Sequence, residues 1–196
     1  MILLIALLAG WLSGLAYAHW QKRSYQTPRI SFIWLAFVAF VPQALAFYLP
    51  ATRARIPDAW AAASLIASQV LLLLFAWVNR KLAGMWLLIL GLVLNLVVIA
   101  SNGGFMPISP ETAARLVPVA VVQAIQPGHR LGFSKDILLL TEDTRLVWLS
   151  DRFLLPAWFF YQVAFSLGDI FIACGIFWLL MRQGIPLRLF ERYKHK

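Results

Sequence analysis

Two aspartates, Asp151 and Asp169, are the residues of this chain whose type and position could support catalysis. Asp169 stands at the mouth of a long apolar stretch, and Asp151 comes shortly before it. Hydrocarbon tolerates a carboxylate poorly, so an acid at the edge of a membrane span is a functional candidate. Two carboxyls that share a site cannot both ionise cheaply, so one keeps its proton. The pair can then activate a water molecule while protonating a carbonyl or leaving group.

Two other interpretations of these acids remain open. Ser166 to Asp169 is a helix-capping pattern, with Ser166 as N-cap and Asp169 at the third helical position. Asp151 followed by Arg152 is typical of a surface ion pair or of a cap. Proton or ion handling is the third function that such acids can have near a membrane. The acids are thus candidates for a catalytic or substrate-binding dyad, for structural roles, or for proton or ion handling.

The composition predicts an integral membrane protein. Hydrophobic residues make up 62% of the chain and the mean hydropathy is +0.78, which leaves too little polar sequence to cover a soluble globule. The formal net charge of +9 indicates contact with anionic headgroups of the lipid bilayer, and no nucleic-acid partner is expected. Cys174 is the single cysteine of the sequence, which excludes a disulfide within the chain and a cysteine-based metal cluster.

Five stretches approach the length that a helix needs to cross a hydrocarbon core, namely 1–18, 30–49, 59–78, 82–100 and 164–182. We expect the first stretch to be retained as a helix, with a cleaved signal peptide as the alternative. Basic residues gather just after the first stretch, between the third and fourth, and in the tail. The positive-inside rule then places the N-terminus outside and the C-terminus in the cytoplasm, in the cell membrane.

The expected fold class is an all-α membrane protein: a five-span transmembrane helical bundle with a small extracytoplasmic cap. Residues 1–100 are expected to form four transmembrane helices, 101–163 the cap and an interfacial segment, 164–182 the fifth helix, and 183–196 a basic cytoplasmic tail. Both acids then lie on the outer side of the membrane.

The cap should contain a helix and a short β-hairpin. Ser109 and Pro110 are typical of a helix start, and the following residues to Ala124 are mostly apolar. Two short apolar runs, 137–140 and 146–149, flank a polar segment and predict a hairpin.

Several residues are candidates for substrate binding beside the acids. Paired glycines permit left-handed dihedrals and a close approach of the backbone to another group. Arg152 could bind an acidic group or a lipid headgroup, or extend to the phosphates of the bilayer. The candidate substrate-binding residues are Asn102, Gly103, Gly104, Arg152 and Ser166.

Small residues at helical spacing predict how the spans pack. Gly10, Gly14 and Ala18 repeat at the four-residue spacing that lets helix backbones approach closely in lipid. Gly91 and Asn95 fall on one face of the fourth span, where a buried amide is expected to form hydrogen bonds across helices.

Across nearly its full length the chain resembles an uncharacterised bacterial family of multi-pass membrane proteins, known as domain of unknown function 5317. The resemblance lies in the layout of the spans and in three motifs, Asn102-Gly103-Gly104-Phe105-Met106-Pro107, Leu149-Ser150-Asp151 and Ser166-Leu167-Gly168-Asp169. This resemblance implies no activity.

A second resemblance is local. The segment from Phe165 to Ile172 is similar to the last-helix signature of lipoprotein signal peptidase, Phe-Asn-x-Ala-Asp-x-x-Ile. Asp151 and Arg152 are similar to the Asp-Arg that ends the other catalytic motif of that family. Ser166 stands where the peptidase has Asn, and the number of spans differs. The resemblance implies that Asp151 and Asp169 form a catalytic dyad at the outer membrane surface.

The functional hypothesis is therefore an aspartyl peptidase-like hydrolase that acts on a lipoprotein, a peptide or a lipid. The alternative is a non-catalytic membrane subunit or scaffold that binds a partner protein or lipid. The sequence contains neither a histidine cluster nor a glycine-rich phosphate loop, so neither a metal nor a cofactor is expected.

Overall fold

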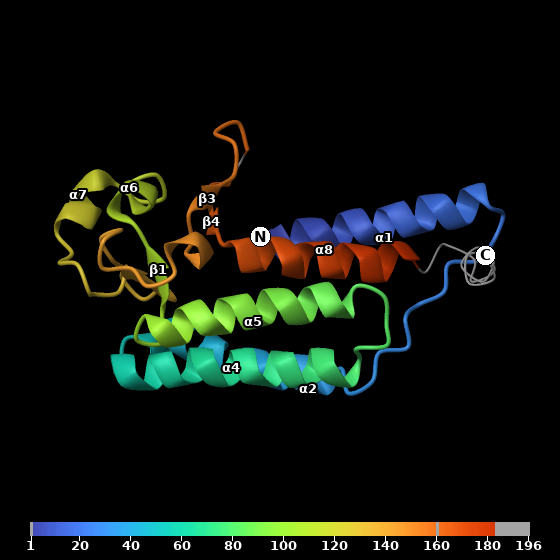
Figure 1. Ribbon diagram of the computed structural model, residues 1–196, viewed down its shortest axis with the longest axis horizontal. Coiled ribbons are helices and arrows are strands. Elements are labelled where there is room, and N and C mark those ends of the chain that lie inside the picture. Colours follow the sequence, from blue (N-terminus) through green and yellow to red (C-terminus); the bar gives the residue numbers. More distant parts are fainter. Residues whose placement is uncertain (1, 160, 183–196) are drawn as a thin grey trace.

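A computed structural model describes residues 2–159 and 161–182 of the chain, and Figure 1 shows its arrangement. The long helices are α1 (Ile2–Trp20), α2 (Trp34–Gln43), α4 (Asp58–Val78), α5 (Met85–Ser101) and α8 (Leu167–Met181). The short helices are α3 (Pro50–Arg53), α6 (Pro110–Ala113) and α7 (Val119–Gln123). The strands are β1 (Met106–Ile108), β2 (Asp136–Leu138), β3 (Phe153–Leu154) and β4 (Ala164–Phe165). A π-helical turn, Ala44–Tyr48, continues α2, and a 3₁₀ turn covers Val147–Leu149.

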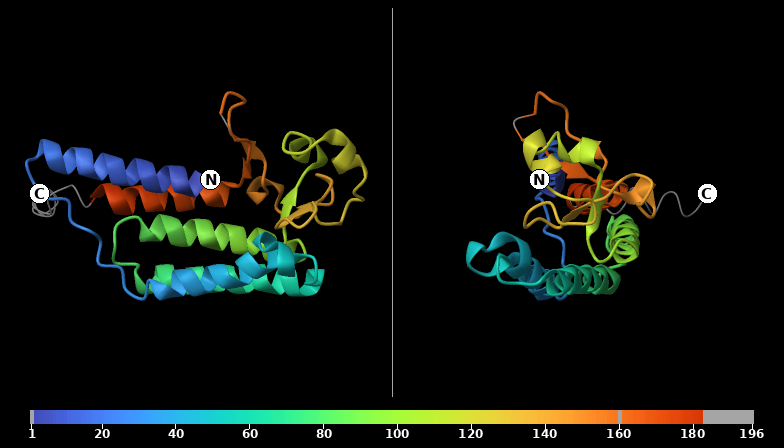
Figure 2. Two further views of the ribbon diagram at one scale, coloured as in Figure 1. Left: turned by 180° about the vertical axis from the view of Figure 1, so that it is seen from behind. Right: turned by 90° about the vertical axis from the view of Figure 1, so that its left-hand side faces the viewer.

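The five long helices lie side by side, and the remaining elements form a cap at one end (Figure 1). Contacts run from α1 to α8, from α8 to α5, from α5 to α4 and from α4 to α2, so α8, the last of the described helices, lies between α1 and α5 (Figure 2). The loop that joins α4 to α5 lies at the end of the bundle opposite the cap (Figure 1).

All five predicted apolar stretches contain helix, but only two of the described helices are long and apolar enough to cross a membrane. These are α1 and α4, whereas the helical segments Trp34–Tyr48, Met85–Ser101 and Leu167–Met181 are apolar but shorter. The structure therefore confirms a mostly helical chain with apolar helices. It does not by itself establish five membrane spans.

Glycines allow α8 to pack closely against both of its neighbours. A Cβ at Gly175 would lie 2.7 Å from the carbonyl oxygen of Gly84, and a Cβ at Gly91 would lie 2.4 Å from the carbonyl oxygen of Gly168. On the other side of α8, a Cβ at Gly10 would lie 2.7 Å from the carbonyl oxygen of Phe177. The close packing predicted from small residues is thus confirmed in α1 and α5.

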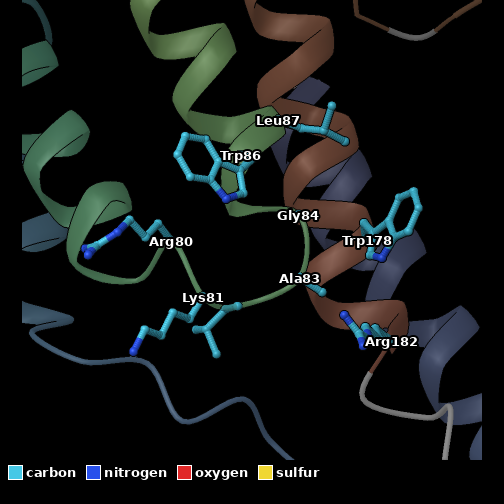
Figure 3. A pocket seen from close by; sticks show the side chains of 9 residues that line it. Arg80, Lys81, Ala83, Gly84, Trp86, Leu87, Trp178 and Arg182 are labelled. Carbon is cyan, nitrogen blue, oxygen red and sulfur yellow. The ribbon is translucent and has the colours of Figure 1, made fainter. Parts of the chain in front are cut away.

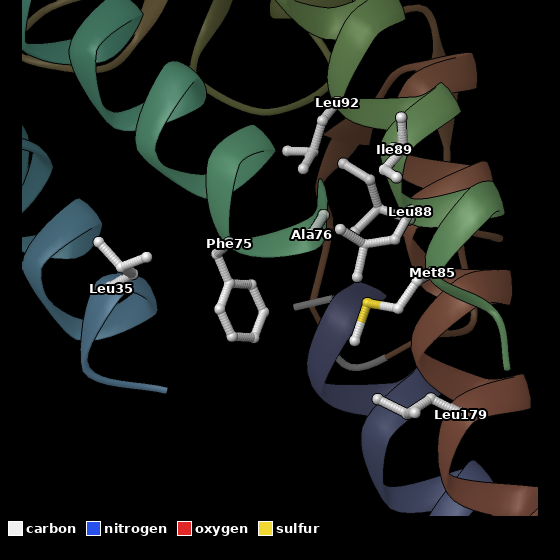
Figure 4. Close-up of a cluster of buried hydrophobic side chains, with 9 residues drawn as sticks. Leu35, Phe75, Ala76, Met85, Leu88, Ile89, Leu92 and Leu179 are labelled. Atoms are coloured by element: carbon white, nitrogen blue, oxygen red, sulfur yellow. The ribbon is translucent and has the colours of Figure 1, made fainter. Parts of the chain in front are cut away.

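A cluster of buried side chains fills the space between α2, α4, α5 and α8. Figure 4 shows Phe75 of α4, Met85 and Leu92 of α5 and Leu179 of α8 in this cluster. The outward faces of the same helices are also apolar. Their exposed large side chains include Phe37, Phe40, Trp60, Leu74, Trp86 and Trp178.

The predicted hairpin between 137–140 and 146–149 is wrong. Strand β2 instead pairs in parallel with β1, with Met106 opposite Asp136 and Ile108 opposite Leu138, and Val147–Leu149 forms a 3₁₀ turn. A short apolar run can pair with any available strand, and β1 offers β2 a partner whose three residues are all buried. The hairpin of the cap lies further along, where β3 and β4 pair antiparallel.

The predicted helix from Pro110 to Ala124 is interrupted. The N-cap is confirmed, because the Ser109 hydroxyl accepts a hydrogen bond from the amide of Thr112 at 3.3 Å. However, α6 ends at Ala113, and Pro118 precedes α7. Proline has no amide hydrogen and disfavours helical dihedrals at the residue before it, so it divides the segment into two short helices.

Arg130 fixes the cap to the bundle. Its guanidinium donates a hydrogen bond to the carboxylate of Asp58, at the start of α4, at 2.9 Å. It also lies 5.3 Å from the ring centre of Phe47 and 5.2 Å from that of Phe105. The buried arginine therefore combines an ion pair with cation–π contacts, which gives the cap a defined position.

Candidate functional site

Asp169 lies in the first turn of α8 and forms a capping box with Ser166. The Ser166 hydroxyl accepts a hydrogen bond from the amide of Asp169 at 3.0 Å, and the Asp169 carboxylate accepts one from the amide of Ser166 at 3.2 Å. Two amides at the helix N-terminus are satisfied in this way. The capping role that the sequence predicted for both residues is confirmed.

Asn95 of α5 connects this helix start to the neighbouring helix. Its amide nitrogen donates to the other carboxylate oxygen of Asp169 at 2.9 Å, and its amide oxygen accepts from the Ser166 hydroxyl at 2.8 Å. Gly168 makes the contact sterically feasible, because a Cβ there would lie 2.0 Å from the Asn95 amide oxygen. Asn95, Ser166 and Asp169 therefore form one polar network between α5 and α8, and the carboxyl of Asp169 has a fixed orientation.

Asp151 is buried, with 1% of its surface exposed. It follows the 3₁₀ turn, and its amide donates to the carbonyl of Pro107 in β1 at 3.1 Å. One carboxylate oxygen accepts a hydrogen bond from the Lys135 ammonium at 2.5 Å. The other oxygen is buried and has no hydrogen-bond partner within the described part of the chain. The surface ion pair that the sequence allowed for Asp151 is therefore wrong.

Lys135 and Asp136 come to this acid through the parallel strand pair. The carbonyl of Lys135 accepts a hydrogen bond from the amide of Met106 at 3.0 Å, directly before β2. The Lys135 ammonium also donates to the carboxylate of Asp136 at 2.8 Å. Its side chain is 37% exposed, so Lys135 connects the buried Asp151 with the surface.

Burial raises the pKa of the Asp151 carboxyl from 3.8 to about 8, although the Lys135 ammonium opposes the rise. The negative charges of Asp136 and Asp169 raise this pKa further. Burial lowers the pKa of Lys135, but attraction by Asp136, Asp151 and Asp169 outweighs it, and the net pKa lies well above 10.5. The three acids and Lys135 therefore act on one another electrostatically as one cluster.

The two acids are brought close enough to interact through their charges, yet each has its own hydrogen-bond partners. Asp151 binds Lys135, whereas Asp169 binds Asn95 and Ser166. Among the described contacts, no hydrogen bond joins the two carboxyls.

Most of the other predicted substrate-binding residues have structural contacts. The Asn102 side chain donates to the carbonyls of Val98 and Arg145 and accepts from the amide of Arg145, so it holds the cap loop against α5. Gly103 and Gly104 have φ angles of 75° and 87°, in the left-handed region that favours glycine.

Arg152 faces its aromatic neighbours. Its guanidinium lies 5.8 Å from the ring centre of Trp148 and 6.0 Å from that of Phe153. The contacts of Arg152 with these rings are cation–π contacts. Ser166 is thus the predicted substrate-binding residue that the structure links by hydrogen bonds to a candidate catalytic acid.

The sequence analysis missed Lys135 and Asp136. A signal was present, because these adjacent opposite charges stand directly before an apolar run in the outer segment. Their pairing with Asp151 depends on the parallel strand pair, which the short runs did not predict. Asn95 was expected to bond across helices, but its partner was not identified.

A hollow of about 310 Å³ opens beside the cluster. Residues from the end of α2, from its π-helical turn and from the cap line it, among them Tyr48, Arg53, Phe133, Lys135 and Asp136. Lys135, which donates to Asp151, lines this hollow, whereas neither Asp151 nor Asp169 does. Within residues 2–159 and 161–182, no group of three or more His, Cys, Asp or Glu is placed to hold a metal ion.

The chain was compared with known families and proteins. The model of the Family of unknown function (DUF5317) matches residues 28–181. No curated protein and no solved structure matches the chain. The local likeness to lipoprotein signal peptidase therefore rests on the motifs around Asp151 and Asp169 alone. Since the match spans most of its length, the chain belongs to the DUF5317 family, whose function is unknown.

Proposed function

We propose that this protein is a multi-pass protein of the cell membrane that acts as an aspartyl hydrolase at the outer face, with Asp151 and Asp169 as its catalytic acids. The observation that carries the proposal is the buried Asp151 carboxyl, which has one oxygen without a partner and a pKa of about 8. Strongly perturbed acids that have specific charged neighbours are enriched at functional sites.

Membrane placement is supported by the apolar outer faces of the helices. Phe37, Trp60 and Trp86 are 69%, 70% and 61% exposed, and each of the five long helices carries exposed large apolar side chains, which is unusual for a soluble monomer. Basic residues of the loop between α4 and α5 lie at one end of the bundle and the acid cluster lies at the other (Figure 1). The positive-inside rule then puts the acid cluster outside, the N-terminus outside and the C-terminus in the cytoplasm.

The two acids would divide the chemistry of hydrolysis. Asp151 carries a proton at neutral pH because its pKa is about 8, so it can protonate the carbonyl oxygen or the leaving group. Asp169, oriented by Asn95 and Ser166, would take a proton from the attacking water. Lys135 borders the hollow and would stabilise negative charge that develops on the substrate.

The substrate would be a lipoprotein, a peptide or a lipid of the outer leaflet. Such molecules present a carbonyl near the headgroup layer, which is the depth that this orientation gives to the cluster. The exposed side chain of Lys135 beside the hollow provides the entrance for that carbonyl.

Reconstituted protein tests this function. Wild type, Asp151→Asn and Asp169→Asn are placed in lipid nanodiscs with a fluorogenic lipoprotein-precursor peptide and, separately, with a mixture of outer-leaflet lipids. We expect hydrolysis by wild type and a loss of at least about 100-fold in each variant. Asp143→Asn is the matched control, because Asp143 is an exposed acid of the same cap.

Equal folding of the variants is checked by thermal unfolding before the rates are compared. Hydrolysis that survives in both variants refutes the dyad. Absence of any hydrolysis by folded wild type, for the peptide and for the lipids, contradicts the enzymatic proposal and favours the second function below.

The second candidate function is a non-catalytic subunit that binds a partner protein or lipid. It is favoured by the β3–β4 hairpin, whose loop projects from the cap (Figure 2) and exposes Trp158 and Tyr161 to 82% and 50%. It also agrees with the separate hydrogen-bond partners of the two acids. Under this function, Trp158→Ala would abolish partner capture by the full-length protein, whereas Asp169→Asn would leave capture unchanged in any variant that folds.

A further inference from the structure

We propose that the end of the bundle opposite the acid cluster binds an anionic phospholipid, with its phosphate in a basic hollow and an acyl chain in an adjoining apolar groove. This inference does not depend on the hydrolase. It requires only that the helices contact lipid.

The basic hollow has a volume of about 600 Å³ and lies around the loop that joins α4 to α5. Figure 3 shows Lys81 and Gly84 on this loop, Trp86 at the start of α5, and Trp178 and Arg182 at the end of α8. The lining contains basic side chains and no acidic residue. It therefore has the charge that attracts a phosphate group.

The three basic residues of the hollow come from different parts of the chain. The Arg80 guanidinium lies 4.9 Å from the ring centre of Trp77 and donates to the Trp77 carbonyl at 3.0 Å, so its position is fixed by α4. The exposed Lys81 belongs to the loop, and Arg182 belongs to the end of α8. We assign the phosphate contacts to Lys81 and Arg182 because they approach the hollow from two separate elements.

The start of α5 adds a second favourable contribution to anion binding. Gly84 is the N-cap of this helix, has a φ angle of 80°, and provides no side chain to cap the first amides. The amide of Met85 donates to the Leu82 carbonyl at 3.3 Å, and no side chain caps the helix start. The positive end of the helix dipole lies at the hollow, which Gly84 and Trp86 line, and it favours an anion there.

An apolar groove next to the basic hollow indicates that the ligand is an amphiphile. It has a volume of about 520 Å³ and is lined by Ala6, Leu87, Ile170, Phe171, Ala173, Cys174, Phe177 and Trp178. Leu87 and Trp178 also line the basic hollow, so the two spaces adjoin. From Ile170 to Trp178 the groove follows α8 for about 12 Å, at 1.5 Å per residue. A phospholipid fills both spaces, whereas a soluble phosphate fills only the first.

This site is tested by native mass spectrometry. The full-length protein is released from detergent in the instrument, and the lipid that it retains is measured. The probes are phosphatidylglycerol, phosphatidylcholine and glycerol 1-phosphate. Lys81→Gln combined with Arg182→Gln removes the charges, and Cys174→Trp places bulk in the groove at an exposed position. Lys22→Gln combined with Arg23→Gln is the matched control, because these exposed basic residues follow α1 and do not line the hollow.

We expect wild type and the control to retain phosphatidylglycerol in preference to phosphatidylcholine. The Lys81/Arg182 variant should retain about tenfold less phosphatidylglycerol, because each basic residue near the headgroup contributes to the attraction. Cys174→Trp should also reduce retention, and glycerol 1-phosphate should not displace the lipid.

Three results overturn the proposal. The first is equal retention by wild type and by the Lys81/Arg182 variant. The second is an equal loss in the Lys22/Arg23 control, which would show only general attraction between a basic protein and an anionic lipid. The third is displacement of the lipid by glycerol 1-phosphate at similar concentrations, which would show a site for a soluble phosphate. Thermal unfolding of each variant confirms folding, and Cys174→Trp tests the site with all charges retained.

Discussion

Replacement of Asp151 by Asn should change the pH dependence of stability. The pKa of Asp151 is raised by burial to about 8 in the folded protein, whereas its ordinary value is 3.8. A raised acid pKa contributes stability that is fully present below the unfolded value and is lost as the pH rises through the folded value. Wild type should therefore lose stability between about pH 4 and pH 8, and Asp151→Asn should not show this loss.

The magnitude follows from linkage. Between the two pKa values, one proton is released on unfolding for each molecule, which corresponds to about 1.4 kcal/mol of unfolding free energy per pH unit. For a chain of this size, 1 kcal/mol corresponds to about 2–4 °C in Tm, so the wild-type curve should fall by about 3–6 °C per pH unit relative to the variant. Replacement of the carboxyl that accepts a hydrogen bond from Lys135 shifts the variant curve by a constant amount and leaves the difference in slope.

The assay is thermal unfolding in detergent from pH 5 to pH 8, followed by tryptophan fluorescence. Asp143→Asn is the control, and its curve should run parallel to that of wild type, since Asp143 is exposed. Parallel curves for wild type and Asp151→Asn would refute the reasoning. They would mean that Lys135 keeps Asp151 charged throughout this pH range.

Three further changes have defined outcomes. Lys135→Gln removes the cation beside the buried Asp151 and should lower the unfolding free energy by about 1–3 kcal/mol. The loss should be larger at pH 8, where part of the acid is ionised, than at pH 5, where it is protonated. A larger loss at pH 5 in thermal unfolding would contradict this. Gly175→Ala places a Cβ 2.7 Å from the Gly84 carbonyl oxygen and should lower the unfolding free energy by about 1–3 kcal/mol through the α5–α8 contact. Gly103→Ala has open space around it, so any loss of stability there should come mainly from the positive φ angle of this residue. In a background where Cys174 is replaced by Ser, Thr141→Cys should react with a membrane-impermeant maleimide in intact cells, and Lys81→Cys should not react. The reverse pattern would show that the protein has the opposite orientation in the membrane.

The long apolar helices were predictable from sequence because each depends on a single property, a run of apolar residues. Local capping was predictable for the same kind of reason. Ser109 and Ser166 act on amides within three residues of themselves, and both caps are observed. These features depend on neighbours in the sequence, which a pattern can show.

The acid cluster was predictable only in part. Asp151 and Asp169 stand out because carboxylates are rare beside apolar segments, but the partners of Asp151 come from a strand pair between distant segments. β1 and β2 are three residues each, and runs of that length do not specify which strand pairs with which. The sequence alone therefore did not identify Lys135 as the cation that neighbours Asp151.

The position of α8 has a consequence for biosynthesis. Among the described helices, α1 is made before the others and packs along α8, which is made last (Figure 1). The glycine surface of α1 therefore stays without its partner until α8, Leu167–Met181, has been made. A chain that stalls before residue 167 would leave the glycine surface of α1 unpaired, where quality-control proteases can recognise it.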